Sequence, residues 1–130
     1  MGIPTFTRAY EASADAGGYL IAKFSDAATS SKVAPASAND DPLIGVFDRQ
    51  GASAGGMADV HRAGLAPVKL GGTVAAGDPL TSDANGKAIK AVAAAGETIQ
   101  LIGRAEQPGV ANDIIDAFLS PGLLHEPAGA

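Results

Sequence analysis

Short runs of large hydrophobic residues alternate with clusters of glycine, proline, aspartate, asparagine and serine along the whole chain. Two runs are especially rich in β-forming residues, at positions 19–24 and 43–47. Such runs, bounded by turn-forming residues, are typical of strands. The 17 glycines and 8 prolines interrupt the chain so often that a long helix is hard to place. The pattern therefore predicts an all-β fold.

The same signals predict several further strands. They fall at residues 57–63, 66–70, 98–105 and 113–119. In the first of these, a period of two places four side chains on one face: Met57, Asp59, His61 and Ala63. Val33 indicates one more short strand inside the polar stretch 25–42.

The segment 73–91 carries the clearest turn chemistry. Gly77-Asp78-Pro79 is a turn sequence, because glycine permits a positive φ angle and proline fixes its own. Asn85-Gly86 lies between two short β-forming runs, Leu80-Thr81 and Lys87-Ala88-Ile89. An Asn-Gly pair in this setting is the strongest short-range signal for a β-hairpin.

Together these elements predict a small β-barrel or β-sandwich of about seven to eight short strands. We divide the chain into an extended N-terminal arm (1–18), the β domain (19–122) and a flexible tail (123–130). In the arm, three spaced apolar residues are expected to contact a partner: Ile3, Phe6 and Tyr10. Pro4, next to Ile3, is expected to take part in the same contact. The alternative, that this segment packs as a first strand on its own domain, stays open.

Charge and composition exclude several classes of function. The net charge is −5, and lysine and arginine form no cluster, so we expect no binding to nucleic acid. Without cysteine there is neither a disulfide nor a thiolate metal site. No apolar run is long enough to span a bilayer, and the N-terminus lacks the pattern of a signal peptide. We therefore expect no membrane contact and a protein made in a cytoplasm.

Few residues offer chemistry. His61 shares a strand face with Asp59, which would suit a small hydrolase, whereas His125 falls in the expected tail. Gly86-Lys87 is followed by Ala88, so the phosphate-binding loop pattern is missing. The acidic residues are too scattered for a divalent-metal loop. We expect no enzyme activity, no cofactor and no metal.

A second alternative comes from residues 75–80 and the hairpin that follows them. This segment is similar to lipoyl and biotinyl carrier domains, in which a lysine at a hairpin tip is modified. Lys87 would be the modified residue here. Its neighbours are Gly86 and Ala88, and the methionine usual in those carriers is missing.

Several segments taken in order resemble the tailed-bacteriophage capsid cement, or head decoration, family. The resemblance covers about residues 10–122 and is strongest over the second half of the chain. It is carried by residues 43–46, 64–69, 71–88, 102–105 and 109–115 and by Pro121-Gly122. Glu106-Gln107-Pro108 departs from the Ala/Gly-rich stretch that the family often has there. Relatives are sometimes labelled as recombinases, but the missing phosphate loop and the acidic charge argue against that activity here.

The resemblance implies a β-barrel or sandwich protein that binds the outer surface of an icosahedral phage head. Such a protein clamps neighbouring major capsid proteins. It would be made in the host cytoplasm and end up on the virion. A homotrimer is favoured and a homodimer comes second, because a clamp on a lattice usually sits on a rotation axis. The partner of Ile3, Pro4, Phe6 and Tyr10 would then be the capsid or a sister subunit.

Overall fold

Nine β-strands and no helix are present in the computed structural model within residues 4–126, the part of the chain that it describes. The all-β prediction is confirmed, with nine strands in place of seven to eight. The strands are β1 (Pro4–Ala12), β2 (Ile21–Phe24), β3 (Lys32–Pro35), β4 (Leu43–Phe47), β5 (Met57–Lys69), β6 (Pro79–Ser82), β7 (Ala88–Lys90), β8 (Thr98–Ala105) and β9 (Ile114–His125).

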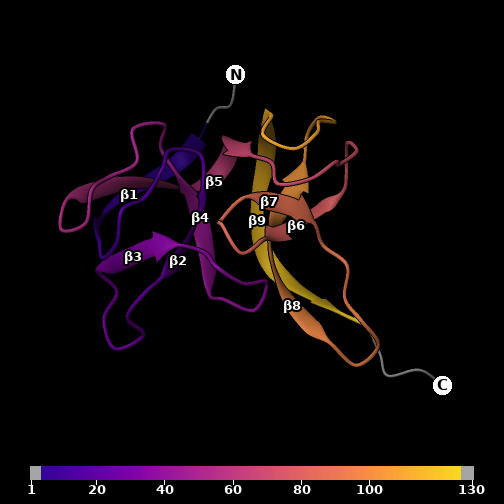
Figure 1. The fold of residues 1–130 in the computed structure, drawn as a ribbon, viewed down its shortest axis with the longest axis horizontal. Helices are drawn as coiled ribbons and strands as arrows, with labels where there is room; N and C mark the ends of the chain where they lie inside the picture. The colour runs from indigo at the N-terminus through magenta and orange to yellow at the C-terminus, as the bar shows by residue number, and fades with distance from the viewer. Residues whose placement is uncertain (1–3, 127–130) are drawn as a thin grey trace.

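The first five strands close into a barrel, and the last four extend it as a sheet. The strand order is β1-β3-β2-β4-β5-β9-β8-β6-β7, and an additional pairing of β1 with β5 closes the ring. The barrel strands lie on the left of Figure 1 and the C-terminal strands on the right, with β5 between them. Because a closed barrel has no unpaired strands, this half of the protein offers no sheet edge for aggregation.

Strand β5 belongs to both halves of the molecule. The sequence predicts two strands here, 57–63 and 66–70, but the structure has one continuous strand of 13 residues. Its first part pairs with β1 and β4, and its last part pairs with β9. Gly64 stands where the partners change: it has a φ of 85° and lies opposite both Pro4 and Leu119. Only glycine adopts this conformation readily, so the residue that resembles a strand breaker allows the strand to continue.

Burial follows the alternation of β5 through both halves. Its even-numbered hydrophobic residues are all buried: Ala58, Val60, Ala66 and Val68. Val60 belongs to a core inside the barrel, and Val68 belongs to a second core under the C-terminal strands. Each fully buried valine stabilises the fold by roughly 1.5–3 kcal/mol. One strand therefore contributes to two hydrophobic cores.

Strand β4 is buried on both faces, which explains its unbroken hydrophobic sequence. Ile44 and Phe47 enter the barrel core, whereas Leu43 and Val46 enter the second core. The two residues that enter the same core are three positions apart, whereas regular strand alternation would place them two apart. The β2–β4 ladder shifts register here: Ala22 pairs with Gly45 and Lys23 with Leu43, so Ile44 is an extra residue without a partner on β2. The predicted strand 43–47 is confirmed residue by residue.

The predicted hairpin is also confirmed, as β6 and β7. Gly86 has a φ of 78°, and the carboxylate of Asp83 accepts hydrogen bonds from the backbone N–H groups of Asn85 and Lys87. The turn is docked on the barrel, because Gly86 is buried and its carbonyl accepts a hydrogen bond from Ile21 N–H at 2.7 Å.

Strand β1 begins at the first described residue, and strand β9 ends one residue before the last described one. Residues 4–12, expected within an arm, form β1, which pairs with β5 of the same chain along most of its length. At the other end, β9 runs beyond the predicted strand 113–119 and into the predicted tail, as far as His125, which pairs with Thr98. Pro121 lies where the β8–β9 ladder shifts register, so its missing N–H breaks no regular pair.

We predict that Gly45→Ala destabilises the protein by at least about 2 kcal/mol, because a β-carbon there would lie 2.1 Å from the backbone oxygen of His61. Gly72→Ala is the matched control, since its nearest neighbour would be the Ile89 side chain at 3.8 Å. Urea unfolding followed by circular dichroism measures the free energy of unfolding of both variants. Equal midpoints for the two variants would contradict the close packing of β4 on β5.

Candidate interaction surface

His61, the residue considered for hydrolysis, contacts side chains from two other parts of the barrel. Its Nδ1 lies 2.8 Å from Thr7 Oγ1 on β1, and its Nε2 lies 3.6 Å from Asp48 Oδ1, beyond the end of β4. The carboxylate beside this imidazole is therefore that of Asp48 and not that of Asp59, the neighbour considered from the sequence. A hydroxyl, an imidazole and a carboxylate are the groups of a hydrolytic triad, but 3.6 Å is longer than the hydrogen bond that orients such an imidazole.

The second histidine lies in the C-terminal sheet, apart from His61 on β5. His125 lies in β9, where its Nδ1 is 2.6 Å from Thr98 Oγ1. Within residues 4–126, no group of three or more His, Cys, Asp or Glu side chains is placed to hold a metal ion. No helix in this range is long and apolar enough to cross a membrane.

Lys87, the residue considered for a carrier function, does not stand at an exposed tip. It follows the buried Gly86, and its own side chain is half-buried. Its Nζ donates a hydrogen bond to Asn112 Oδ1 at 2.9 Å, which ties the hairpin to the segment before β9. This geometry differs from that of a freely presented carrier lysine.

The four residues predicted to meet a partner have different environments. Ile3 lies outside the described residues, and Pro4 begins β1 opposite Gly64. Phe6 is 52% exposed, whereas Tyr10 is 1% exposed and part of the barrel core. Of the two aromatic residues, Phe6 is therefore open to a partner and Tyr10 is enclosed in its own domain.

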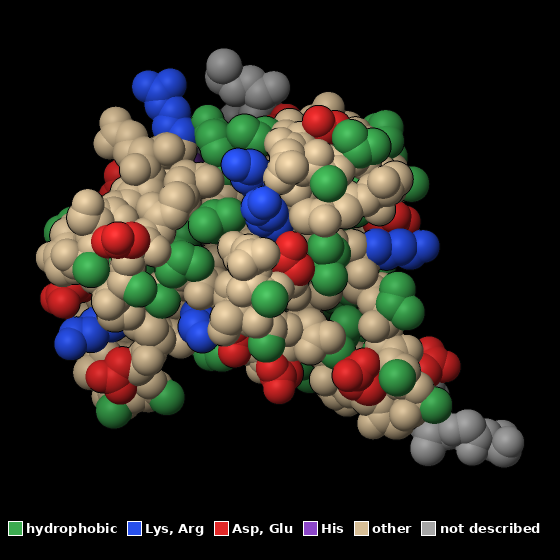
Figure 2. Space-filling view, viewed as in Figure 1, with side chains coloured by type: hydrophobic (Ala, Val, Ile, Leu, Met, Phe, Trp, Pro, Cys, Tyr) green, Lys and Arg blue, Asp and Glu red, His purple; other side chains and the backbone are tan. Residues whose placement is uncertain are grey.

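Other exposed hydrophobic side chains were not singled out from the sequence. On β9, Ile114 and Phe118 are 49% and 53% exposed, and both face away from the core on alternate positions. The strand alternation of β9 is the signal that could have found them. The face of the molecule in Figure 2 carries hydrophobic side chains in small groups among polar and charged ones.

A cluster of two arginines and two aromatic rings closes one end of the barrel, and sequence analysis missed it. Arg8 Cζ lies 4.9 Å from the centre of the Tyr10 ring, and Arg62 Nη1 donates a hydrogen bond to Tyr10 Oη at 2.9 Å. Arg62 Nε donates to the backbone oxygen of Ile44 at 3.2 Å. Phe24 completes the cluster, edge-on to Tyr10 with 6.0 Å between ring centres.

A β-bulge directs Arg62 into this cluster. Thr7 pairs with His61 and the preceding Phe6 pairs with Ala63, so Arg62 has no partner on β1. Bulges re-aim side chains and are frequent beside functional sites. The alternation of Arg8 and Tyr10 on one strand face is visible in the sequence, but the bulge that brings Arg62 to them depends on strand register.

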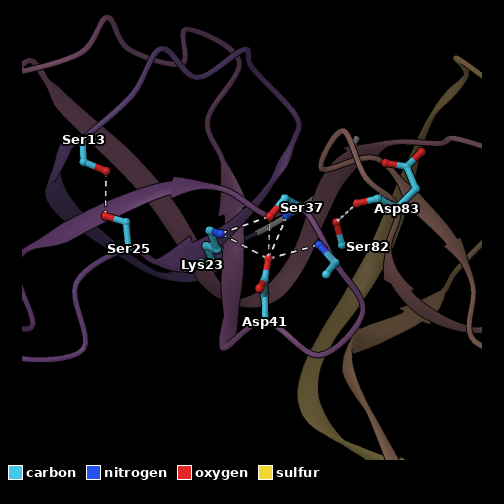
Figure 3. A network of polar contacts seen from close by, with 8 residues as sticks. Ser13, Lys23, Ser25, Ser37, Asp41, Ser82 and Asp83 are labelled. Atoms are coloured by element: carbon cyan, nitrogen blue, oxygen red, sulfur yellow. Dashed lines mark hydrogen bonds and ion pairs between the residues drawn. The ribbon is translucent and has the colours of Figure 1, made fainter.

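A polar network fixes the loop between β3 and β4. Asp41 Oδ2 accepts hydrogen bonds from the backbone of Ser37 at 2.8 Å and of Ala38 at 3.1 Å, and it lies 3.3 Å from Lys23 Nζ (Figure 3). The same loop reaches the C-terminal sheet, where Asn39 O accepts a hydrogen bond from Gln100 N–H at 2.7 Å. The network therefore positions a connection between the two halves.

The surroundings of Asp41 shift its protonation. Burial alone would raise the pKa of Asp41, but the hydrogen bond from the Ser37 backbone and the charge and hydrogen bond of Lys23 outweigh it. The pKa of Asp41 therefore lies below its ordinary value of 3.8. A lowered carboxyl pKa means that the folded protein holds the charged form more firmly than the unfolded chain does.

Comparison with known proteins finds similarity at the level of the fold. No protein-family model matches the sequence, and no curated protein matches it. Among solved structures, the chain is similar to the N base of the head fiber protein gp8.5 of bacteriophage phi29, with a TM-score of 0.66 and 15% sequence identity. The similarity covers 92% of this chain and 95% of the phi29 chain. At this identity, the comparison establishes a shared fold.

We predict that Asp41→Asn destabilises the protein at pH 7 by about 1 kcal/mol or less, because the ion pair is partly exposed to solvent. As pH falls below about 4, the unfolded chain takes up the proton before the folded one, so the wild type loses this contribution. Melting temperatures from pH 7 to pH 3 should therefore converge for wild type and variant. Asp40→Asn removes an exposed charge next to the network and serves as the control. A gap between wild type and Asp41→Asn that stays constant down to pH 3 would contradict the role of the carboxylate.

Proposed function

We propose that this protein is a structural component of a bacteriophage head, a cement or decoration protein that binds the outer surface of the capsid. The observation that carries the proposal is the fold similarity to the phi29 head fiber base, which extends over nearly the whole of both chains. The resemblance of several sequence segments to the capsid cement family points the same way. The proposed partner is the major capsid protein, and the proposed location is the virion.

The physical character of the domain fits this role. The acidic net charge of −5 suits a position outside the shell, away from packaged DNA. The closed barrel also hides its strand edges, which suits a protein present in many copies around one particle.

For the contact itself, we propose the end of the barrel where β1 begins, with Phe6 as the anchor. Ile3 and Pro4 stay candidate contact residues from the sequence. Exposed aromatic side chains are common anchors of protein interfaces. Tyr10 would support this surface from below, because its ring is buried. We keep a homotrimer as the first proposed assembly and a homodimer as the second.

The proposal predicts that the purified protein binds expanded, undecorated heads of the phage that encodes it, at a fixed ratio to the capsid protein. Cryo-electron microscopy of the mixture should show extra density on the outer surface at symmetry-related positions. Density at local threefold axes would identify the trimer, and density at twofold axes the dimer.

Unexpanded heads are the informative control for this experiment, because their lattice presents different contacts between capsid proteins. Heads that remain bare at a large excess of the purified protein would refute the proposed function. Binding without any fixed stoichiometry would refute it as well, since a cement protein occupies defined lattice positions.

A further inference from the structure

We propose that the arginine-aromatic end of the barrel, built from Phe6, Arg8 and Arg62, binds a carboxylate group of a protein partner. The inference rests on the proposed function for the identity of the partner, the phage capsid. The carboxylate chemistry rests on the arrangement of the side chains themselves.

The first argument is that two cationic groups meet here without an anion. Arg8 is exposed, and among the described residues its guanidinium group contacts the Tyr10 ring but makes no hydrogen bond or ion pair. Arg62 uses Nε and Nη1 on Ile44 and Tyr10, which leaves Nη2 without a partner in the same part of the chain. Both groups contact the same residue, Tyr10: Arg8 lies over its ring, and Arg62 donates a hydrogen bond to its hydroxyl.

The second argument concerns the two faces of the barrel wall. Arg8 and Tyr10 occupy even positions of β1, whereas Glu11 is at an odd position and pairs with Met57. On β5, Asp59 is likewise at an odd position, on the face of the exposed Met57. Strand alternation therefore keeps these carboxylates on the outer face and away from the two arginines. In a protein of net charge −5, the end of the barrel is a local cationic site.

The third argument is that the site is preorganised. The bulge at Arg62, its two hydrogen bonds and the buried Tyr10 hold that guanidinium group in place before any partner arrives. Arg8 is held by its stacking on the same ring. A planar guanidinium matches a carboxylate with two parallel hydrogen bonds, so less conformational entropy is lost on binding.

The fourth argument selects a protein as the source of the anion. Phe6 lies two residues before Arg8 on β1, so strand alternation places its exposed ring beside the cationic site. An apolar ring next to a carboxylate-binding group fits an acidic segment of a protein surface. Two arginines without further basic residues beside them in the sequence do not form the track that the phosphate backbone of a nucleic acid requires.

The test compares how strongly two charge-reversed variants bind undecorated heads, one changed inside the proposed carboxylate site and one changed outside it. Arg8→Glu should weaken binding to undecorated heads by about tenfold or more, because a buried interfacial charge would face a like charge. Arg49→Glu makes the same change of net charge at another exposed position and should alter binding by less than about twofold. Phe6→Ser should also weaken binding, and circular dichroism confirms that each variant folds.

The outcomes separate this inference from the proposed function. If the wild type binds heads and Arg8→Glu binds equally well, or if Arg49→Glu loses as much as Arg8→Glu, the carboxylate site is refuted while the head-binding function stands. If the wild type does not bind heads, the proposed function fails, and a second measurement decides the site.

That second measurement is an NMR titration of the free protein with sodium N-acetylaspartate against sodium chloride at equal ionic strength. The Nε–Hε signals of Arg8 and Arg62 should move together with N-acetylaspartate and saturate. The signal of Arg49 should not follow them. Shifts of Arg8 and Arg62 no larger than those of Arg49 would refute the site.

Discussion

The arrangement of the whole molecule depends on the shared strand β5. Its first half closes the barrel through β1 and β4, and its second half begins the C-terminal sheet through β9. The two hydrophobic cores are thereby built on opposite ends of a single element. Gly64 makes this possible, because a residue with a side chain would be strained at its positive φ angle. The docked hairpin turn at Gly86 and the loop held by Asp41 add further connections between the halves.

Local signals predicted much of the fold, and long-range pairing accounts for what they missed. Residues 43–47 and 98–105 form strands with the predicted bounds, and Asn85-Gly86 forms the predicted turn, because hydrophobic runs and turn residues act locally. The continuity of β5 was missed because Gly64 resembles a break, and only its partners on both sides show that the strand passes through it.

Long-range strand pairing also explains why the sequence pointed to only part of the candidate surface. The apolar spacing of the first residues treated Phe6 and Tyr10 alike, as contact residues. The burial of Tyr10 depends on β1 pairing within its own chain, whereas Phe6 is exposed. Arg62 reaches Tyr10 through a bulge, and His61 meets Thr7 and Asp48 through strand register. No spacing along the sequence encodes these contacts.

Native-state hydrogen exchange along β5 tests this dependence most directly. If one strand couples both cores, its amides in the barrel half, near Val60, and in the sheet half, near Val68, should exchange with the same free energy of opening. That free energy should equal the one for global unfolding measured by denaturant, as expected for a single cooperative unit. A barrel half that opens at a distinctly lower free energy than the sheet half would contradict the account.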